Sequence, residues 1–204
     1  ISDNTIVLYK EEGFSLEELT LMVERGNHRM QGEALISDLL QGRINAKTLG
    51  KFDINDPEIG KSERANEIIG ARVDILALAA LENQLRLDNV GLVKAKTVVE
   101  FANGPTSKEA EIKLYERGVE VLHDTLVNAG GVIVSSFETE QAVTGKWLSA
   151  DEVGEKKRRI LEAAAEAVKN TRAKYGIKTN RIAGDVNAIL RIAKVKESGR
   201  GASS

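Results

Sequence analysis

Short apolar runs and amphipathic segments alternate along the middle of the chain. Runs of four to six residues, typical of buried strands, lie at residues 73–78, 97–101 and 119–122. Periodicity alone leaves a helix open for the first of them. The segment between the last two runs has helical spacing over residues 107–117, with Ser107 or Thr106 as N-cap and Gly118 after its end. Strands separated by a helix of this length are typical of a parallel sheet, so the pattern predicts an α/β fold.

Three further segments have the spacing of amphipathic helices. In residues 15–25, Ser15 is a predicted N-cap and Glu18 lies three residues later, as in a capping box. The other two segments and their apolar stripes are residues 151–174, with Val153, Ile160, Leu161, Ala164 and Val168, and residues 181–197, with Ile182, Val186, Ile189, Leu190 and Ala193. Residues 26–70 hold several glycines and show weak periodicity, which favours short helices or an insertion. We expect a sheet-bearing domain over residues 1–148 and a helical segment over residues 149–204.

Small polar residues follow two of the predicted strands. Asn103-Gly104-Pro105-Thr106 comes after the strand at 97–101, and a second cluster begins at Asn128, soon after the strand at 119–122. Ligands of open α/β sheets bind beyond the carboxyl ends of the strands, which is where both clusters are expected. The first cluster is typical of a turn in which Thr106 caps the next helix. The alternative is a binding site at which Asn103 presents its amide to a ligand.

The second cluster, Asn128-Ala129-Gly130-Gly131-Val132, has a stronger reason to be functional. Two adjacent glycines inside a helical run cost about 2 kcal/mol relative to alanine, and a sequence accepts that cost where a ligand approaches the backbone closely. Asn128 offers both a donor and an acceptor, which suits a carboxamide ligand. Ser135 lies seven residues later, two helical turns, and so on the same face. The alternative is a loose helix start without a binding role.

Composition narrows the classes of function. The 204 residues carry a net charge of −2 and no cysteine, so we expect neither nucleic acid nor membrane as a partner, and no disulfide or thiolate nucleophile. No apolar run approaches the roughly 20 residues of a membrane span. His28 and His123 lack a second ligand at metal spacing, so no metal site is expected. We expect Trp147 to pack, residues 156–159 to form a solvated helix face, and the cysteine-free chain to be cytoplasmic.

Four segments of the chain form one further pattern: ISDNTIVLYKEEGF (1–14), VDILALAALENQL (73–85), VVEFANGPTSKEA (98–110) and HDTLVNAGGVIVSSFE (123–138). In this order they resemble the nucleotide-binding half of glutamate dehydrogenase and of its leucine, phenylalanine and valine dehydrogenase relatives. The resemblance implies a Rossmann-like parallel sheet, incomplete in this chain, followed by C-terminal helices. It also implies that the family's N-terminal catalytic domain and Gly-rich turn are missing. We therefore expect a fragment or excised domain with no catalytic residue and, alone, no activity.

The activity implied by the resemblance is oxidative deamination of L-glutamate to 2-oxoglutarate and ammonia, with NAD or NADP as cofactor. The implied cofactor-binding residues are Asp3, Asn83, Asn103 and Asn128. Val132 and Ser135 would face the substrate side chain, and the Ser135 hydroxyl favours glutamate because branched-chain relatives carry an apolar residue there. For Asp3, the residues alone allow either a ribose contact at a strand end or a solvated turn.

Two alternatives stay open for the function. One is a non-catalytic remnant or regulatory module that keeps the fold, and the other is a different amino-acid dehydrogenase. The partners implied for the full-length enzyme are a small-molecule substrate, L-glutamate or 2-oxoglutarate, and further copies of itself in a homo-oligomer.

Overall fold

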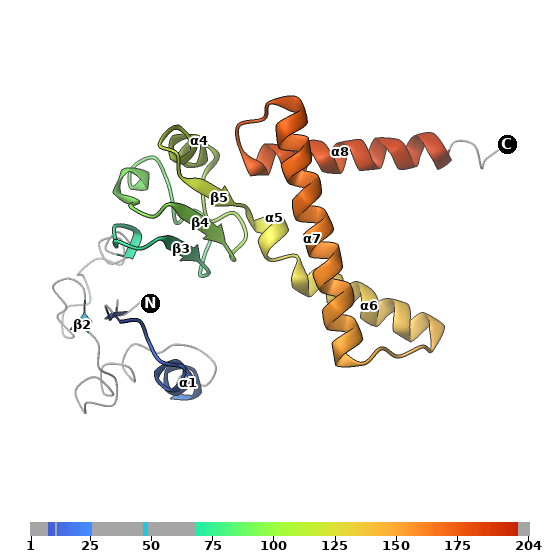
Figure 1. Cartoon of the computed structure of the whole chain (residues 1–204), viewed down its shortest axis with the longest axis horizontal. Helices are drawn as coiled ribbons and strands as arrows, with labels where there is room; N and C mark the ends of the chain where they lie inside the picture. The colour runs from blue at the N-terminus through green and yellow to red at the C-terminus, as the bar shows by residue number, and fades with distance from the viewer. Residues whose placement is uncertain (1–7, 11, 26–46, 49–67, 200–204) are drawn as a thin grey trace. The chain divides into compact units, whose positions relative to one another are not determined.

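The computed structural model describes residues 8–10, 12–25, 47–48 and 68–199 (Figure 1). The chain divides into two compact units, one of residues 1–72 with 91–94 and one of residues 73–90 with 95–204. The second unit includes residues on both sides of position 148, and the predicted domain boundary there stays a prediction. Asp3 and His28 lie outside the described residues, as does most of the segment 26–70.

The first unit contains the predicted N-terminal helix. Helix α1 (Leu16–Arg25) begins after Ser15, whose Oγ accepts the Glu18 backbone N–H at 3.1 Å while the Glu18 carboxylate accepts the Ser15 N–H at 2.7 Å. This reciprocal pair confirms the predicted capping box. Two short strands, β1 (Leu8–Tyr9) and β2 (Lys47–Thr48), pair antiparallel in the same unit.

The second unit is built on a parallel sheet. Its strands are β3 (Ile75–Leu78), β4 (Thr97–Glu100) and β5 (Glu120–Leu122), in the order β3-β4-β5. In register, Val98 lies between Leu76 on one side and Val121 on the other, and all three are buried. The predicted α/β fold and its parallel strands are therefore confirmed, each strand being one or two residues shorter than expected. A short 3₁₀ helix, η1 (Val90–Leu92), precedes β4.

Helix α4 (Lys108–Glu116) connects β4 to β5 and packs on β5. Of the two predicted caps, Ser107 is the one used, because its side chain accepts the Ala110 N–H at 3.2 Å. Thr106 instead forms a parallel bridge with Leu85, and its buried Oγ1 has no partner among the described residues. The expectation that Thr106 caps this helix is therefore wrong.

Four helices follow β5. They are α5 (Asp124–Val127), α6 (Gly130–Thr144), α7 (Ala150–Tyr175) and α8 (Asn180–Gly199). The long α7 lies against both α6 and α8 (Figure 1). The turn between α6 and α7 is fixed by Gly145 in the left-handed region, at φ 67°, and by a capping box between Ser149 and Glu152. The two predicted C-terminal helices are confirmed with slightly wider bounds.

The predicted apolar stripes of these helices are only partly buried. Val168 of α7 is buried, but Ile160 of the same stripe is exposed, as are Ile182, Ile189 and Leu190 of α8. Helical periodicity identifies an apolar face, but it cannot tell whether another element covers that face. The expectation that Trp147 packs is also wrong, since 77% of it is exposed in the turn between α6 and α7.

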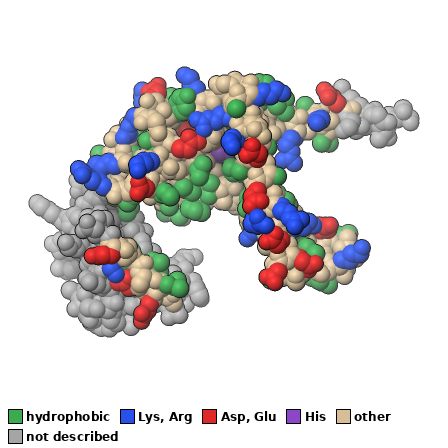
Figure 2. Space-filling view, viewed as in Figure 1, with side chains coloured by type: hydrophobic (Ala, Val, Ile, Leu, Met, Phe, Trp, Pro, Cys, Tyr) green, Lys and Arg blue, Asp and Glu red, His purple; other side chains and the backbone are tan. Residues whose placement is uncertain are grey.

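Surface charge follows the sequence prediction more closely. Acidic and basic side chains are interspersed over the face shown in Figure 2, without a large area of one sign. Arg158 pairs with Glu155 and Glu162 along α7, while Lys156 reaches Glu140 of α6 at 3.0 Å. The basic run 156–159 thus forms exposed helix pairs, as expected. In the part of the chain that is described, no helix is long and apolar enough to cross a membrane.

Candidate functional site

An open cleft of about 800 Å³ lies beyond the carboxyl ends of β3 and β4. Its walls come from the segments that follow these two strands and from the first turns of α6, and its lining residues are Ala80, Leu81, Glu82, Phe101, Ala102, Asn103, Asn128, Gly131, Val132 and Ser135. Four residues that the sequence singled out, Asn103, Asn128, Val132 and Ser135, are therefore brought together. This is the edge at which open α/β sheets bind ligands.

The side chains of Asn103 and Asn128 contact each other in the wall of the cleft. Asn128 Nδ2 donates to Asn103 Oδ1 at 2.7 Å and to the Phe101 carbonyl at 3.3 Å. Among the described residues, neither Asn128 Oδ1 nor Asn103 Nδ2 has a recorded partner, so the pair keeps one acceptor and one donor for a ligand. A carboxamide needs one group of each kind, and the pair fits it.

Helix α6 forms the opposite part of the lining. Gly131, Val132 and Ser135 reach the cleft from its first two turns, and 76% of Val132 is exposed. Asn128 belongs to the C-terminus of α5 and precedes α6. The prediction that one helix carries both Asn128 and Ser135 is therefore wrong. The two residues still line one cleft, because the break between α5 and α6 is only two residues long.

The helix that lines the cleft is α6 and not α4, the helix that follows Asn103. Ser107 and Lys108, at the start of α4, do not belong to the lining. The adjacent glycines begin α6 and do not interrupt a helix. A Cβ added to Gly131 would meet no atom within 4 Å, which leaves room for a ligand beside the backbone.

Asn83 lies next to the cleft and outside its lining. It is a non-glycine residue at positive φ, 53°, and its N–H donates to the Gly104 carbonyl at 2.9 Å. Its own carbonyl accepts from Arg86 at 3.0 Å. The backbone of Asn83 thus holds the loop that carries Asn103, and the predicted cofactor contact of its side chain stays a prediction.

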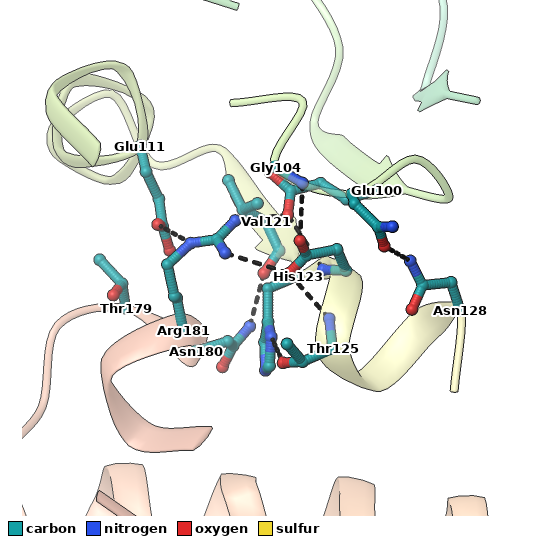
Figure 3. A network of polar contacts seen from close by, with 12 residues as sticks. Glu100, Gly104, Glu111, Val121, His123, Thr125, Asn128, Thr179, Asn180 and Arg181 are labelled. Carbon is teal, nitrogen blue, oxygen red and sulfur yellow. Dashed lines mark hydrogen bonds and ion pairs between the residues drawn. The ribbon is translucent and has the colours of Figure 1, made fainter. Parts of the chain in front are cut away.

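Behind the cleft lies a buried charged cluster, defined as Glu100, Glu111, Asp124 and Arg181. Figure 3 labels Glu100, Glu111 and Arg181 of this cluster. The guanidinium of Arg181, from α8, reaches Glu100 at 2.6 Å, Glu111 at 2.9 Å and Asp124 at 3.0 Å. These carboxylates come from the end of β4, from α4 and from the start of α5. No local pattern in the sequence predicts this cluster.

Burial and hydrogen bonding act in opposite directions on the pKa values of Glu111 and Asp124. Burial raises the pKa of Glu111 above its ordinary value, although Arg181 acts against this. For Asp124, burial also acts to raise the pKa, but the N–H groups of Gly104 and Thr125 and the Arg181 guanidinium outweigh it. The pKa of Asp124 is therefore lowered, and this residue carries its negative charge at neutral pH.

His123 lies beside the charged cluster, and its surroundings indicate a structural role. Its ring is buried, Nδ1 lies 2.6 Å from Thr125 Oγ1, and Gly184 of α8 packs against the ring edge. Burial lowers the pKa of His123, and the nearby Arg181 lowers it further, so the ring is neutral at pH 7. Among the described residues, no group of three or more histidines or acidic residues could hold a metal ion.

The chain thus has a parallel sheet, a cleft beyond the strand ends and a pair of amides beside that cleft. These features are typical of α/β proteins that bind a ligand at the carboxyl edge of the sheet. A sequence model of the glutamate/leucine/phenylalanine/valine dehydrogenase family matches residues 1–200. The chain belongs to this family.

Individual relatives agree with this assignment. The chain is 58% identical over 91 residues to an NADP(+)-dependent glutamate dehydrogenase of Pyrobaculum calidifontis, a match covering 45% of this chain and 21% of that protein. It is 47% identical over 102 residues to an NAD-specific glutamate dehydrogenase of Staphylococcus aureus, covering 50% of this chain and 25% of that protein. The hetero-hexameric glutamate dehydrogenase of Thermus thermophilus in its leucine-bound form superposes with a TM-score of 0.62 at 26% identity, over 80% of this chain and 36% of that chain.

All three matches cover only part of the relatives. They span between 21% and 36% of the relatives' own length. The fold and the family thus apply to the chain as it stands, whereas the activity of a whole enzyme is a matter of proposal.

Proposed function

We propose that the full-length protein carrying this chain is an NAD(P)-dependent glutamate dehydrogenase, and that the chain supplies the cofactor-binding portion. The reaction converts L-glutamate, water and the oxidised cofactor to 2-oxoglutarate, ammonium, the reduced cofactor and a proton. The observation that carries the proposal is the cleft in which Asn103, Asn128 and Ser135 meet at the carboxyl edge of the sheet. Family membership supports the same activity.

The amide pair fits the nicotinamide end of the cofactor. Asn128 Oδ1 would accept from a carboxamide N–H, and Asn103 Nδ2 would donate to a carboxamide oxygen, which are the two groups left over from their mutual bond. When bound, the nicotinamide supplies a hydride acceptor. The chain's own residues hold that ring in one orientation, which lowers the entropic part of the barrier.

The α6 side of the cleft suits the substrate side chain. Val132 offers an exposed apolar surface, and Ser135 offers a hydroxyl two residues beyond the first turn. A hydroxyl can donate to a carboxylate, whereas a leucine or valine side chain would leave it unpaired. This difference favours L-glutamate over branched-chain amino acids, although another amino-acid dehydrogenase is the second candidate because the family includes such enzymes.

The relatives support both a nicotinamide cofactor and an assembly of subunits. The Pyrobaculum enzyme is NADP(+)-dependent, the Staphylococcus enzyme is NAD-specific and the Thermus enzyme is hetero-hexameric by their names. We therefore propose NAD or NADP as cofactor and an oligomer as the active form. Cytoplasmic localisation stays a prediction from the sequence.

The test is steady-state kinetics of the full-length protein with L-glutamate and either cofactor. Asn128→Ala removes the bond to Asn103 and the acceptor offered to the carboxamide, so the cofactor KM should rise about tenfold. Asn170→Ala, an exposed asparagine of α7, is the matched control and should behave like the wild type. Absence of NADH or NADPH formation by the wild type would contradict the proposal, and turnover of leucine or valine in place of glutamate would favour the second candidate.

A further inference from the structure

We propose that Asp124 and Arg181 are positioning residues for the cofactor site. Together they fix the positions of Asn103 and Asn128 relative to each other from behind the cleft. The inference rests on the proposed function for the meaning of that site. It adds that a helix remote in sequence, α8, sets the geometry of the amide pair. Neither residue lines the cleft.

Asp124 is the point at which the two halves of the amide pair are tied together. Its Oδ2 accepts the Gly104 N–H at 2.7 Å, which fixes the loop residue next to Asn103. Its Oδ1 accepts the Thr125 N–H at 2.8 Å, and its backbone carbonyl accepts the Asn128 N–H at 2.9 Å. One residue thus holds the loop after β4 and both ends of α5.

Arg181 in turn holds Asp124 against the sheet. It pairs with Asp124 Oδ1 at 3.0 Å and with Glu100 Oε2 at 2.6 Å, and the same Glu100 oxygen accepts the Asp124 N–H at 3.0 Å. The last residue of β4 and the first residue of α5 therefore share one cation from α8 (Figure 3). Moving Arg181 would release both segments at once.

The charge balance of the cluster argues for a role beyond packing. One guanidinium faces three carboxylates, and Glu100 and Glu111 each keep one buried oxygen without a hydrogen-bond partner among the described residues. Buried ion pairs are frequently no more stabilising than apolar side chains of the same volume. Such a cluster does fix the positions of the segments that its residues belong to. The 2.7 Å contact between Asn128 and Asn103 requires these segments to be fixed.

The cluster also contains its own control. Glu111 pairs with Arg181 at 2.9 Å from α4, and among the described residues no hydrogen bond or ion pair joins its side chain to the loop of Asn103 or to α5. Loss of its charge weakens the same ionic cluster without releasing the amide pair. A purely structural cluster should respond alike to changes at Asp124 and at Glu111, whereas a positioning role separates them.

The first experiment compares Asp124→Asn, Arg181→Lys and Glu111→Gln in the full-length protein. We expect the cofactor KM to rise about tenfold in Asp124→Asn and severalfold in Arg181→Lys, with the glutamate KM changed less than twofold. Glu111→Gln should leave both within twofold of the wild type, whatever its melting temperature. Equal cofactor KM values for Asp124→Asn and Glu111→Gln would overturn the inference.

A second measurement needs no cofactor and so separates this inference from the proposed function. Amide hydrogen exchange of the ligand-free proteins should become faster over residues 102–106 and 125–130 in Arg181→Lys and Asp124→Asn, and stay unchanged there in Glu111→Gln. A wild type that does not use glutamate refutes the proposed function but leaves this comparison intact. Unchanged exchange in Arg181→Lys and Asp124→Asn would refute the positioning role by itself.

Discussion

Ser135 faces the cleft with its hydroxyl uncommitted. Its Oγ has no hydrogen-bond partner among the described residues, whereas the next residue, Ser136, donates to the Ile133 carbonyl at 2.7 Å. A serine within a helix frequently bonds back to the preceding turn. Ser136 makes such a bond and Ser135 does not. The Ser135 hydroxyl is therefore free to donate to a ligand.

We expect Ser135→Val in the full-length protein to shift substrate preference away from glutamate. The change removes a donor to the γ-carboxylate and adds apolar bulk, and a hydrogen bond to a charged group is worth roughly 1.5–3 kcal/mol. The ratio of kcat/KM for glutamate to that for norvaline should fall about ten- to a hundredfold. The cofactor KM should change little, since the amide pair is untouched.

Ser136→Val serves as the control for this shift. It deletes a hydroxyl from the adjacent position, where the hydroxyl is already bonded to the backbone. Its glutamate-to-norvaline ratio should match the wild type. If Ser135→Val also keeps the wild-type ratio, Ser135 makes no contact with the substrate side chain and the glutamate assignment loses its most direct residue.

Residue types explain which parts of the site the sequence could reveal. Asn103 directly precedes Gly104, and Asn128 lies two residues before the Gly130-Gly131 pair, so local sequence already marks them. Arg181 meets Glu100, Glu111 and Asp124 across separations of 81, 70 and 57 residues. No local pattern carries a contact of that range. Each of these residues, taken alone, resembles an ordinary surface charge.

At the scale of elements, α8 is held to the sheet by a close approach at Gly184. A Cβ at this position would lie 2.9 Å from Cε1 and 3.0 Å from Nε2 of His123. The ring is buried and its Nδ1 lies 2.6 Å from Thr125 Oγ1, so it has little freedom to move aside. Only glycine lets the helix come this near to the residue that precedes α5.

We expect Gly184→Ala to lower stability although alanine favours helix. The propensity gain is about 1 kcal/mol, while forcing a methyl group into a packed contact costs about 1–3 kcal/mol. Gly154→Ala in α7 is the matched control, because its added Cβ meets no atom within 4 Å and should raise the melting temperature. Thermal unfolding of both full-length variants decides, and an increase for Gly184→Ala equal to that for Gly154→Ala would show that the His123 ring yields.

The elements themselves were largely predictable, and their junctions were not. Apolar runs located β3, β4 and β5, and cap residues located α1 and α4, because these signals act within a few residues. The break between α5 and α6 was not predicted, because the pattern around Gly130 and Gly131 favours one continuous helix. The exposed face of α8 was missed because burial depends on neighbours that a single segment does not specify.

At the scale of the whole molecule, the described cleft holds only part of what dehydrogenation requires. Its lining includes amides, a hydroxyl and apolar groups, and Glu82 is the one ionisable side chain in it. A dicarboxylate substrate calls for cationic partners, and proton transfer calls for an acid or base within reach of the amino group. Glu82 is acidic and so does not supply the cationic partner. The described lining therefore does not supply every group that the proposed reaction needs.

We accordingly expect the purified 204-residue chain to form no NADH or NADPH from L-glutamate, under conditions in which the full-length protein does so. Holding one reactant in place supplies only one part of the rate enhancement, and the lining of the described cleft includes no cationic side chain to bind the substrate carboxylates. The measurement is absorbance of the reduced cofactor at high protein concentration, after circular dichroism has shown that the chain is folded. Turnover by the folded chain would mean that residues within it, Glu82 first among them, perform the proton transfer that we assign to other parts of the enzyme.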